Sequence, residues 1–253
     1  MSGFSKSRRV IIANWKMHIN SSKEAAVFLA ALRKKARAFK GVEIWLAPAF
    51  PLIATLKNPS IKIGAQTVSA YEGGAHTGEV SVATLKNVGA TFCLVGHSER
   101  REFESDEIVR EQFARALSAK LTAVLCIGER ERSAEGAHFS FIEGQLKSAF
   151  SGVRPQDAGR VIIAYEPIWA IGRSAQEAMQ PSEIQEMVIF IRKTLSDMLG
   201  RPAAAKIPIL YGGSVEPTNA REIITEGGVA GLLVGHASAD LNLFLEILKI
   251  CRK

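Results

Sequence analysis

Short apolar stretches alternate with segments of helical periodicity along almost the whole chain. Residues 10–13 form the first apolar stretch, and residues 22–39 follow with a helical pattern behind a serine cap. In that pattern Ala26, Leu29 and Ala30 recur at the spacing of one helix face. The beginning of the chain therefore predicts one strand followed by one helix.

The same unit recurs to the end of the sequence. Strands are predicted near residues 10–13, 42–47, 62–65, 91–95, 122–127, 160–165, 207–211 and 231–234. Helices are predicted near residues 22–39, 51–56, 81–88, 106–119, 139–150, 181–199, 218–225 and 242–251. Strands such as 161–164 are apolar at every position, which is typical of a parallel sheet covered by helices.

Eight strand–helix units of about 32 residues match the size of a (β/α)8 barrel, about 250 residues. No linker, charge block or low-complexity tract divides the chain, so residues 1–253 are expected to form a single α/β domain. The alternative is an open doubly wound sheet. That fold usually carries a glycine-rich phosphate turn after its first strand, whereas Asn14-Trp15-Lys16 stands there.

Composition narrows the class of protein. A hydrophobic fraction of 47% excludes a disordered or collagen-like chain. The net charge of +7 comes from short basic groups without interleaved aromatic residues, so we expect no nucleic-acid partner. Cys93, Cys126 and Cys251 have neither disulfide nor zinc spacing, and no apolar run is long enough for a membrane helix. A cytoplasmic protein without a membrane partner is expected.

Candidate chemistry lies directly after the predicted strands, where barrels of this kind build their active sites. Lys16, His97 and Glu166 follow the first, fourth and sixth strands, and glycine turns at Gly212 and Gly235 follow the last two. Glycine turns leave backbone N–H groups free for an anion such as phosphate. A carboxylate, an imidazole and an ammonium group suit proton abstraction beside a carbonyl. These residues predict a small phosphorylated substrate, with no metal ligands.

Five separated segments together resemble the triosephosphate isomerase family over nearly the whole chain. They are Asn14-Trp15-Lys16-Met17, Gly78-Glu79-Val80-Ser81, Gly96 to Arg101, Ala164 to Gly172, and Tyr211-Gly212-Gly213-Ser214-Val215. The resemblance implies a TIM barrel that interconverts dihydroxyacetone phosphate and D-glyceraldehyde 3-phosphate in glycolysis and gluconeogenesis. It also implies that the reaction requires neither a metal nor an organic cofactor.

The resemblance assigns a role to each catalytic residue. Glu166 would shuttle a proton between the two substrate carbons, and His97 would polarise the carbonyl as a neutral imidazole. Lys16 would supply positive charge to the substrate, and Asn14 would line the pocket. The intermediate of such a reaction is an enediolate.

The resemblance likewise assigns the phosphate-binding and supporting residues. Residues 167–172 would form a lid containing Trp169, with the N–H of Gly172 on the phosphate and with Tyr211 and Ser214 holding the lid shut. Gly235 and His236 would complete the phosphate site, and Glu99 and Arg100 would support the catalytic residues. The loop from Gln66 to Glu79, with Thr77 at its tip, would insert into a second subunit, so a homodimer is expected.

Three departures from the family pattern leave alternatives open. The stretch from Arg173 to Gln180 is longer than the usual hinge, His236 replaces the usual second glycine of the phosphate turn, and the segment after Arg101 is about two residues short. These changes allow a related isomerase of a larger ketose phosphate, such as a tetrulose phosphate, and a catalytically idle scaffold is a further alternative. We hypothesise that His236 adds a pH-dependent contact to phosphate. His18, His76 and His138 belong to no motif, so structural roles are expected for them.

Overall fold

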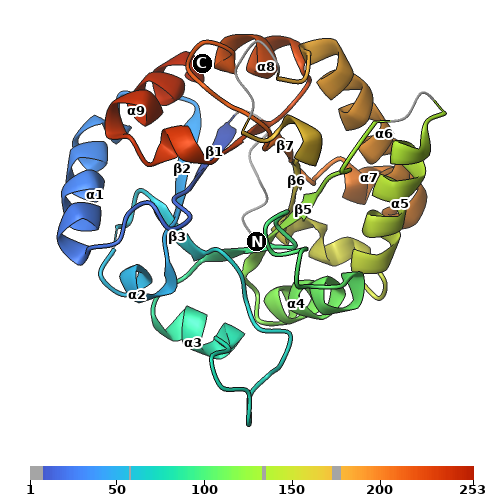
Figure 1. Cartoon of the computed structure of the whole chain (residues 1–253), viewed down its shortest axis with the longest axis horizontal. Helices are drawn as coiled ribbons and strands as arrows, with labels where there is room; N and C mark the ends of the chain where they lie inside the picture. Colours follow the sequence, from blue (N-terminus) through green and yellow to red (C-terminus); the bar gives the residue numbers. More distant parts are fainter. Residues whose placement is uncertain (1–7, 57, 133–134, 173–177) are drawn as a thin grey trace.

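The apolar stretches become eight parallel strands that close into one barrel in chain order (Figure 1). The computed structural model describes residues 8–56, 58–132, 135–172 and 178–253. The strands are β1 (Arg9–Asn14), β2 (Val42–Ala47), β3 (Lys62–Ala65), β4 (Phe92–Val95), β5 (Thr122–Ile127), β6 (Val161–Tyr165), β7 (Ile209–Tyr211) and β8 (Gly231–Val234). Because β1 bonds to both β2 and β8, the sheet has no open edge, and the doubly wound alternative is wrong.

Helices surround the barrel between successive strands. They are α1 (Ser22–Ala36), α2 (Phe50–Ile53), α3 (Val82–Asn87), α4 (Asp106–Ser118), α5 (Ala137–Ala149), α6 (Pro181–Leu199), α7 (Arg201–Ala204), α8 (Ala220–Glu226) and α9 (Leu241–Ile250), with 3-10 turns η1 (Pro155–Arg160), η2 (Ile168–Ala170) and η3 (His236–Ser238). Side-chain oxygens of Ser21, Ser81, Ser105 and Asp240 accept N–H groups of the first turns of α1, α3, α4 and α9. These caps fix where those helices begin.

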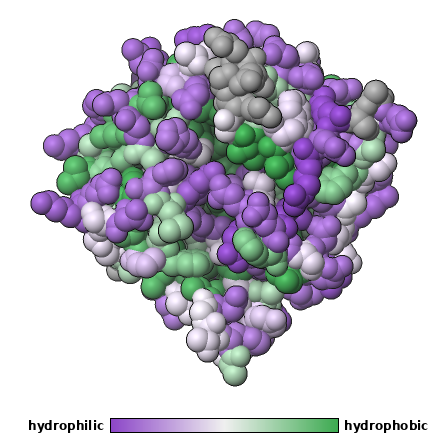
Figure 2. All heavy atoms as spheres, in the orientation of Figure 1, coloured by the Kyte–Doolittle hydropathy of each residue, from purple (hydrophilic) through white to green (hydrophobic). Residues whose placement is uncertain are grey.

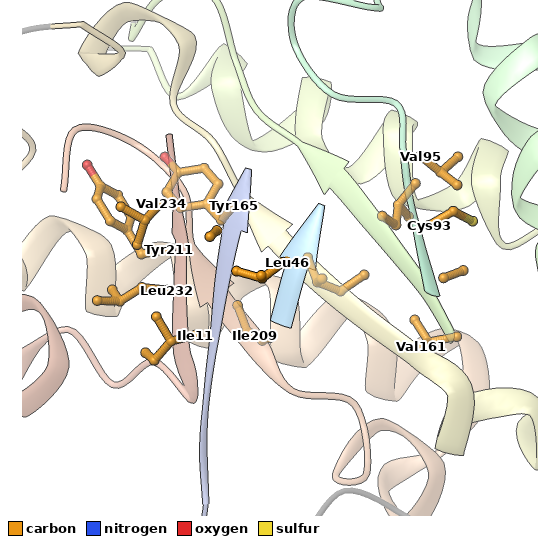
Figure 3. Packing of buried hydrophobic residues seen from close by; sticks show 14 of the residues in the cluster. Ile11, Leu46, Cys93, Val95, Val161, Tyr165, Ile209, Tyr211, Leu232 and Val234 are labelled. Atoms are coloured by element: carbon orange, nitrogen blue, oxygen red, sulfur yellow. The ribbon is translucent and has the colours of Figure 1, made fainter. Parts of the chain in front are cut away.

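The alternation of buried side chains explains why the strands read as continuously apolar. Val10 and Ile12 belong to a cluster built from strand residues alone, which fills the barrel interior. Ile11 and Ala13 belong to the larger cluster shared with the helices. Figure 3 shows part of this outer layer, including Ile11. Both faces of each strand are therefore buried, as parallel sheets require.

Hydrophilic residues cover most of the outline of the molecule in Figure 2, with smaller hydrophobic patches between them. No helix within the described residues is long and apolar enough to span a membrane.

The predicted element boundaries hold to within a few residues, and the largest differences have local causes. The predicted strand 207–211 begins at Ile209, because the N–H of Ile207 closes the turn that ends α7 and Pro208 has no N–H. The short helix α7 was not predicted. The helix predicted over 22–39 ends at Ala36, and reverse turns lead from there to Gly41, whose φ is +75°.

Candidate active site

A cavity of about 250 Å³ lies at the carboxyl ends of the strands and collects most of the predicted site residues. Its lining comes from the loops after β1, β4, β6, β7 and β8. The lining residues are Asn14, Lys16, His97, Glu166, Ile171, Gly172, Gly212, Gly213, Ser214, Val215, Glu216, Leu233, Gly235 and His236. The closed sheet is what brings residues 14 and 236 to one pocket.

Glu166, directly after β6, is a buried carboxylate with one occupied oxygen and one free oxygen. Its side chain is 2% exposed, and Oε2 accepts the backbone N–H of Ser98 at 3.3 Å. Oε1 accepts no hydrogen bond from the described residues and lies 3.7 Å from Nε2 of His97. A buried, under-bonded oxygen that lines a cavity is a candidate proton acceptor.

Two glycines make room for this carboxylate. A Cβ on Gly212 would lie 2.8 Å from Cγ of Glu166, and a Cβ on Gly128 would lie 1.7 Å from its carbonyl oxygen. Real Cβ atoms essentially never approach an unbonded heavy atom this closely, so any larger residue at either position would displace the Glu166 backbone or side chain. The glycines at these strand ends therefore serve packing as well as turn geometry.

The Glu166 carboxylate also acts on the thiol behind it. Cys126 in β5 is fully buried, and burial first and the charge of Glu166 second raise the pKa of the Cys126 thiol. The thiol is therefore protonated and unreactive at neutral pH.

The protonation state of His97 follows from its hydrogen bond. Its Nδ1 accepts the backbone N–H of Glu99 at 3.2 Å, so Nδ1 carries no proton and the ring is neutral, with its N–H at Nε2. The tight turn that supplies this N–H is closed by the N–H groups of Arg100 and Arg101 on the carbonyl of His97. Nε2 therefore presents a hydrogen-bond donor next to Glu166, within the cavity.

Lys16 is held in an unusual backbone conformation, with φ of +47°. Oδ1 of Asn14 accepts the Lys16 N–H at 3.1 Å, and Nε2 of Gln66 donates to the Lys16 carbonyl at 2.9 Å. Its ammonium group lies 2.6 Å from Oε1 of Glu99. Burial raises the pKa of Glu99, but the hydrogen bond and charge of Lys16, followed by His97 and His18, lower it further than burial raises it.

The base of the predicted lid is bonded to Glu129, which lies just beyond β5. Its buried Oε1 accepts the indole N–H of Trp169 at 3.0 Å and the hydroxyl of Tyr165 at 2.8 Å. Its carbonyl accepts the N–H of Ile168 at 2.9 Å. Burial and then the Glu129 carboxylate raise the pKa of Tyr165, which stays a neutral donor.

The turns after β7 and β8 bring backbone N–H groups to the lining of the cavity. Within the described residues, the N–H groups of Gly213, Ser214, Gly235 and His236 donate to no protein acceptor. Gly172 adds a left-handed residue, with φ of +71°, at the end of the described lid. An array of free N–H groups suits an anion such as phosphate.

Some predicted residues lie outside the cavity. Nε and Nη2 of Arg100 both bond Oε1 of Glu104, at 2.9 and 2.6 Å. The hydroxyl of Tyr211 is buried, and burial first and then the Glu129 and Glu183 carboxylates raise its pKa. Thr77 is exposed on its loop. The long hinge after Gly172 lies mainly outside the described residues, which resume at Ala178.

Three supporting residues were not singled out from the sequence, namely Gln66, Arg101 and Glu129. Arg101 bonds the carbonyls of Gly96 and Cys126, so it ties the β4 turn to β5. Gln66 and Glu129 stand directly beyond a strand end, and this position is the signal that would have pointed to them, whereas Arg101 lies farther along the loop after β4. Their partners come from other strands, so the sequence alone did not define their contacts.

Comparisons with known proteins agree with this geometry. A family model described as triosephosphate isomerase matches residues 9–251. A triosephosphate isomerase from Thermus thermophilus is 40% identical over 251 residues, which cover 96% of this chain and 99% of that relative. Proteins of the same name from Dehalococcoides mccartyi and Flavobacterium johnsoniae are 39% and 36% identical, over 97% and 95% of this chain and 96% and 98% of their own lengths. The chain belongs to the triosephosphate isomerase family.

Proposed function

We propose that this chain interconverts dihydroxyacetone phosphate and D-glyceraldehyde 3-phosphate through an enediolate intermediate, a step of glycolysis and gluconeogenesis. The observation that supports it best is the free Oε1 of buried Glu166 beside the neutral imidazole of His97. Both groups share a cavity with Gly213, Ser214, Gly235 and His236, whose N–H groups donate to no acceptor among the described residues and would suit a phosphate. One pocket thus combines a base, an oxygen-stabilising donor and an anion site.

In the proposed reaction, Oε1 of Glu166 removes a proton from the carbon beside the substrate carbonyl. Negative charge develops on the carbonyl oxygen, where the N–H of His97 and the ammonium group of Lys16 stabilise it. The proton of the neighbouring hydroxyl passes to this oxygen beside Nε2 of His97, and Glu166 returns its own proton to the former carbonyl carbon, which converts ketose to aldose. Asn14 acts through Lys16, whose backbone it holds.

The phosphate would rest on the backbone N–H groups of Ser214, Gly235 and His236, with Gly172 joining them when residues 167–172 close. Closure would exclude water from the enediolate, which otherwise eliminates phosphate. The bonds of Trp169 and Tyr165 to Glu129 support one end of this lid. The hydroxyl of Tyr211 lies next to Gly213, within the turn that follows β7.

A homodimer and a cytoplasmic location are part of the proposal. Met17, Tyr71 and Phe103 are 80%, 51% and 79% exposed, and they lie in the loops after β1, β3 and β4. Such exposed apolar residues around the loop from Gln66 to Glu79 suit a contact with a second copy. A single species of twice the chain mass in sedimentation velocity would support the dimer, and Phe103→Asp should weaken it. The three cysteines are buried and unpaired, which suits a reducing compartment.

A tetrulose phosphate isomerase is the second candidate, favoured by the imidazole of His236 at the phosphate turn. Its test is the ratio of kcat/KM for three-carbon and four-carbon ketose phosphates. A ratio well below one would reject the triose as the main substrate.

Steady-state turnover of D-glyceraldehyde 3-phosphate in a dehydrogenase-coupled assay tests the proposal, with Glu166→Gln as the key variant. This change keeps the size of the side chain and removes the proton acceptor, so kcat should fall at least about 10²-fold to 10⁴-fold. An unchanged melting temperature would show that the fold is intact. If the unmodified protein turns over slowly and Glu166→Gln has the same kcat, the isomerase function is rejected. The catalytically idle scaffold would then remain.

A further inference from the structure

A second histidine stands beside His236 at the phosphate end of the cavity. The rings of His18 and His236 meet edge to face, with centroids 5.5 Å apart and planes at 77°. His236 lines the cavity, and both rings are exposed. His18 belongs to no sequence motif, and its partner His236 lies more than two hundred residues away along the chain.

Lys16 supplies the one lysine or arginine charge among the described residues that line this cavity. The carboxylates of Glu166 and Glu216 line the same cavity. Lys16 is already paired with a third carboxylate, that of Glu99, which also interacts with His97 and His18. Nζ of Lys16 would lie 3.8 Å from a Cβ on Gly235, so this ammonium group reaches the phosphate turn, but its charge is shared with the Glu99 carboxylate.

An imidazole is the side chain that takes up a proton between about pH 8 and pH 5. The edge-to-face contact allows one ring to carry that proton over the face of the other, as in a cation–π pair. A positive ring next to the backbone N–H of His236 would offset part of the negative charge and add a charge-assisted hydrogen bond.

We propose that His18 and His236 act together as a binding element for the phosphate dianion, which holds it more tightly when the pair is protonated. This inference rests on the proposed function for the location of the phosphate. Neither ring lies at the reacting carbons in this arrangement, since Glu166 and His97 flank those. The pair therefore acts on binding, and its expected signature is on KM and on inhibitor affinity more than on kcat.

The test uses sulfate as a competitive inhibitor, because sulfate remains a dianion over the whole range and its own titration does not intervene. Its inhibition constant should fall about tenfold from about pH 8 to about pH 5.5 in the unmodified enzyme. In His236→Asn and in His18→Asn, which keep polar side chains without the titrating ring, the pH dependence should flatten. The double variant should lose no more than the larger single loss, because the rings act as one unit.

Proton NMR of the unmodified protein gives a second measurement that does not depend on variants folding. Sulfate should shift the ring signals of both histidines and move their titration midpoints to higher pH. Unmoved ring signals, or variants with the same pH slope as the unmodified enzyme, would overturn the proposal. A pH-dependent sulfate site in a protein without triose phosphate turnover would instead reject the proposed function and keep the histidine pair.

Discussion

Each end of the barrel has a cavity, and the candidate catalytic residues line the smaller of these two. At the amino-terminal end a groove of about 1220 Å³ lies between α1 and the starts of β2 and β3. Its cations are exposed at its edges: Arg8, Arg33, Lys34, Arg37, Lys40 and Lys62. At the carboxyl end about 250 Å³ is lined by buried Asn14, His97 and Glu166.

The difference lies in how the polar groups are held. Exposed arginine and lysine side chains are solvated and mobile, and they impose no geometry on a ligand. Glu166 is buried, bonded through one oxygen and open through the other, and His97 is fixed in one tautomer by a backbone N–H. Burial with incomplete bonding, rather than volume or net charge, therefore distinguishes the candidate active site.

The strongest test of this difference between the two cavities is a variant that moves the Glu166 carboxylate but keeps its charge. Gly212→Ala adds a methyl group 2.8 Å from Cγ of Glu166, so the carboxylate must shift. A shift of about 1 Å should lower kcat about 10²-fold. Gly144→Ala in α5, where nothing lies within 4 Å, is the matched control and should leave kcat unchanged. Normal kcat in Gly212→Ala would show that the site tolerates loose placement.

Two tryptophan variants compare the ends of the barrel with the same chemical change. Trp169→Phe removes the indole bond to Glu129 at the base of the lid and should lower kcat about threefold to tenfold, with more phosphate eliminated per turnover. Trp45→Phe removes a fully buried indole from the barrel interior at β2. It should lower the free energy of unfolding by about 1–3 kcal/mol and leave kcat unchanged. Equal effects of both variants on kcat would contradict the comparison.

The ion pair of Glu99 and Lys16 gives a pH-dependent prediction for the carboxyl end. The pKa of Glu99 is lower in the folded protein than its ordinary value, so the pair stabilises the fold above that value. This contribution is lost as the pH falls through the lowered pKa. Urea unfolding should show Glu99→Gln less stable by at most about 1 kcal/mol near pH 7, with the difference vanishing near pH 3. A difference that grows on acidification would have the wrong sign.

The smallest effect is expected from the basic groove. Arg33→Ala with Arg37→Ala removes two exposed cations at the end of α1, neither of which forms an ion pair with another described residue. Unfolding should change by about 1 kcal/mol or less, from the lost interaction with the helix dipole. The kcat/KM for triose phosphate should stay within about twofold. A large loss would mean that the groove contributes to substrate capture.

Most of the barrel could be predicted from the sequence, because its strands and helices depend on patterns within short segments. The run 161–164 is apolar at each position since one set of side chains fills the barrel and the other meets the helices. The helix predicted over 181–199 is α6 without change, because Pro181 and the box formed by Gln180 and Glu183 define its start. Strand ends in a barrel share one face, so Lys16, His97 and Glu166 were expected to meet.

Other features depended on partners far apart in the chain. Nothing near Glu129 in the sequence indicates the indole of Trp169, and nothing near His18 indicates the ring of His236. The tautomer of His97 follows from one N–H two residues away, but only the folded turn aims it at Nδ1. Hydrophobic periodicity and the residues at strand ends are properties of short segments, so the sequence alone determines them. Hydrogen bonds between loops of different strands form only when the barrel closes, so they belong to the tertiary structure.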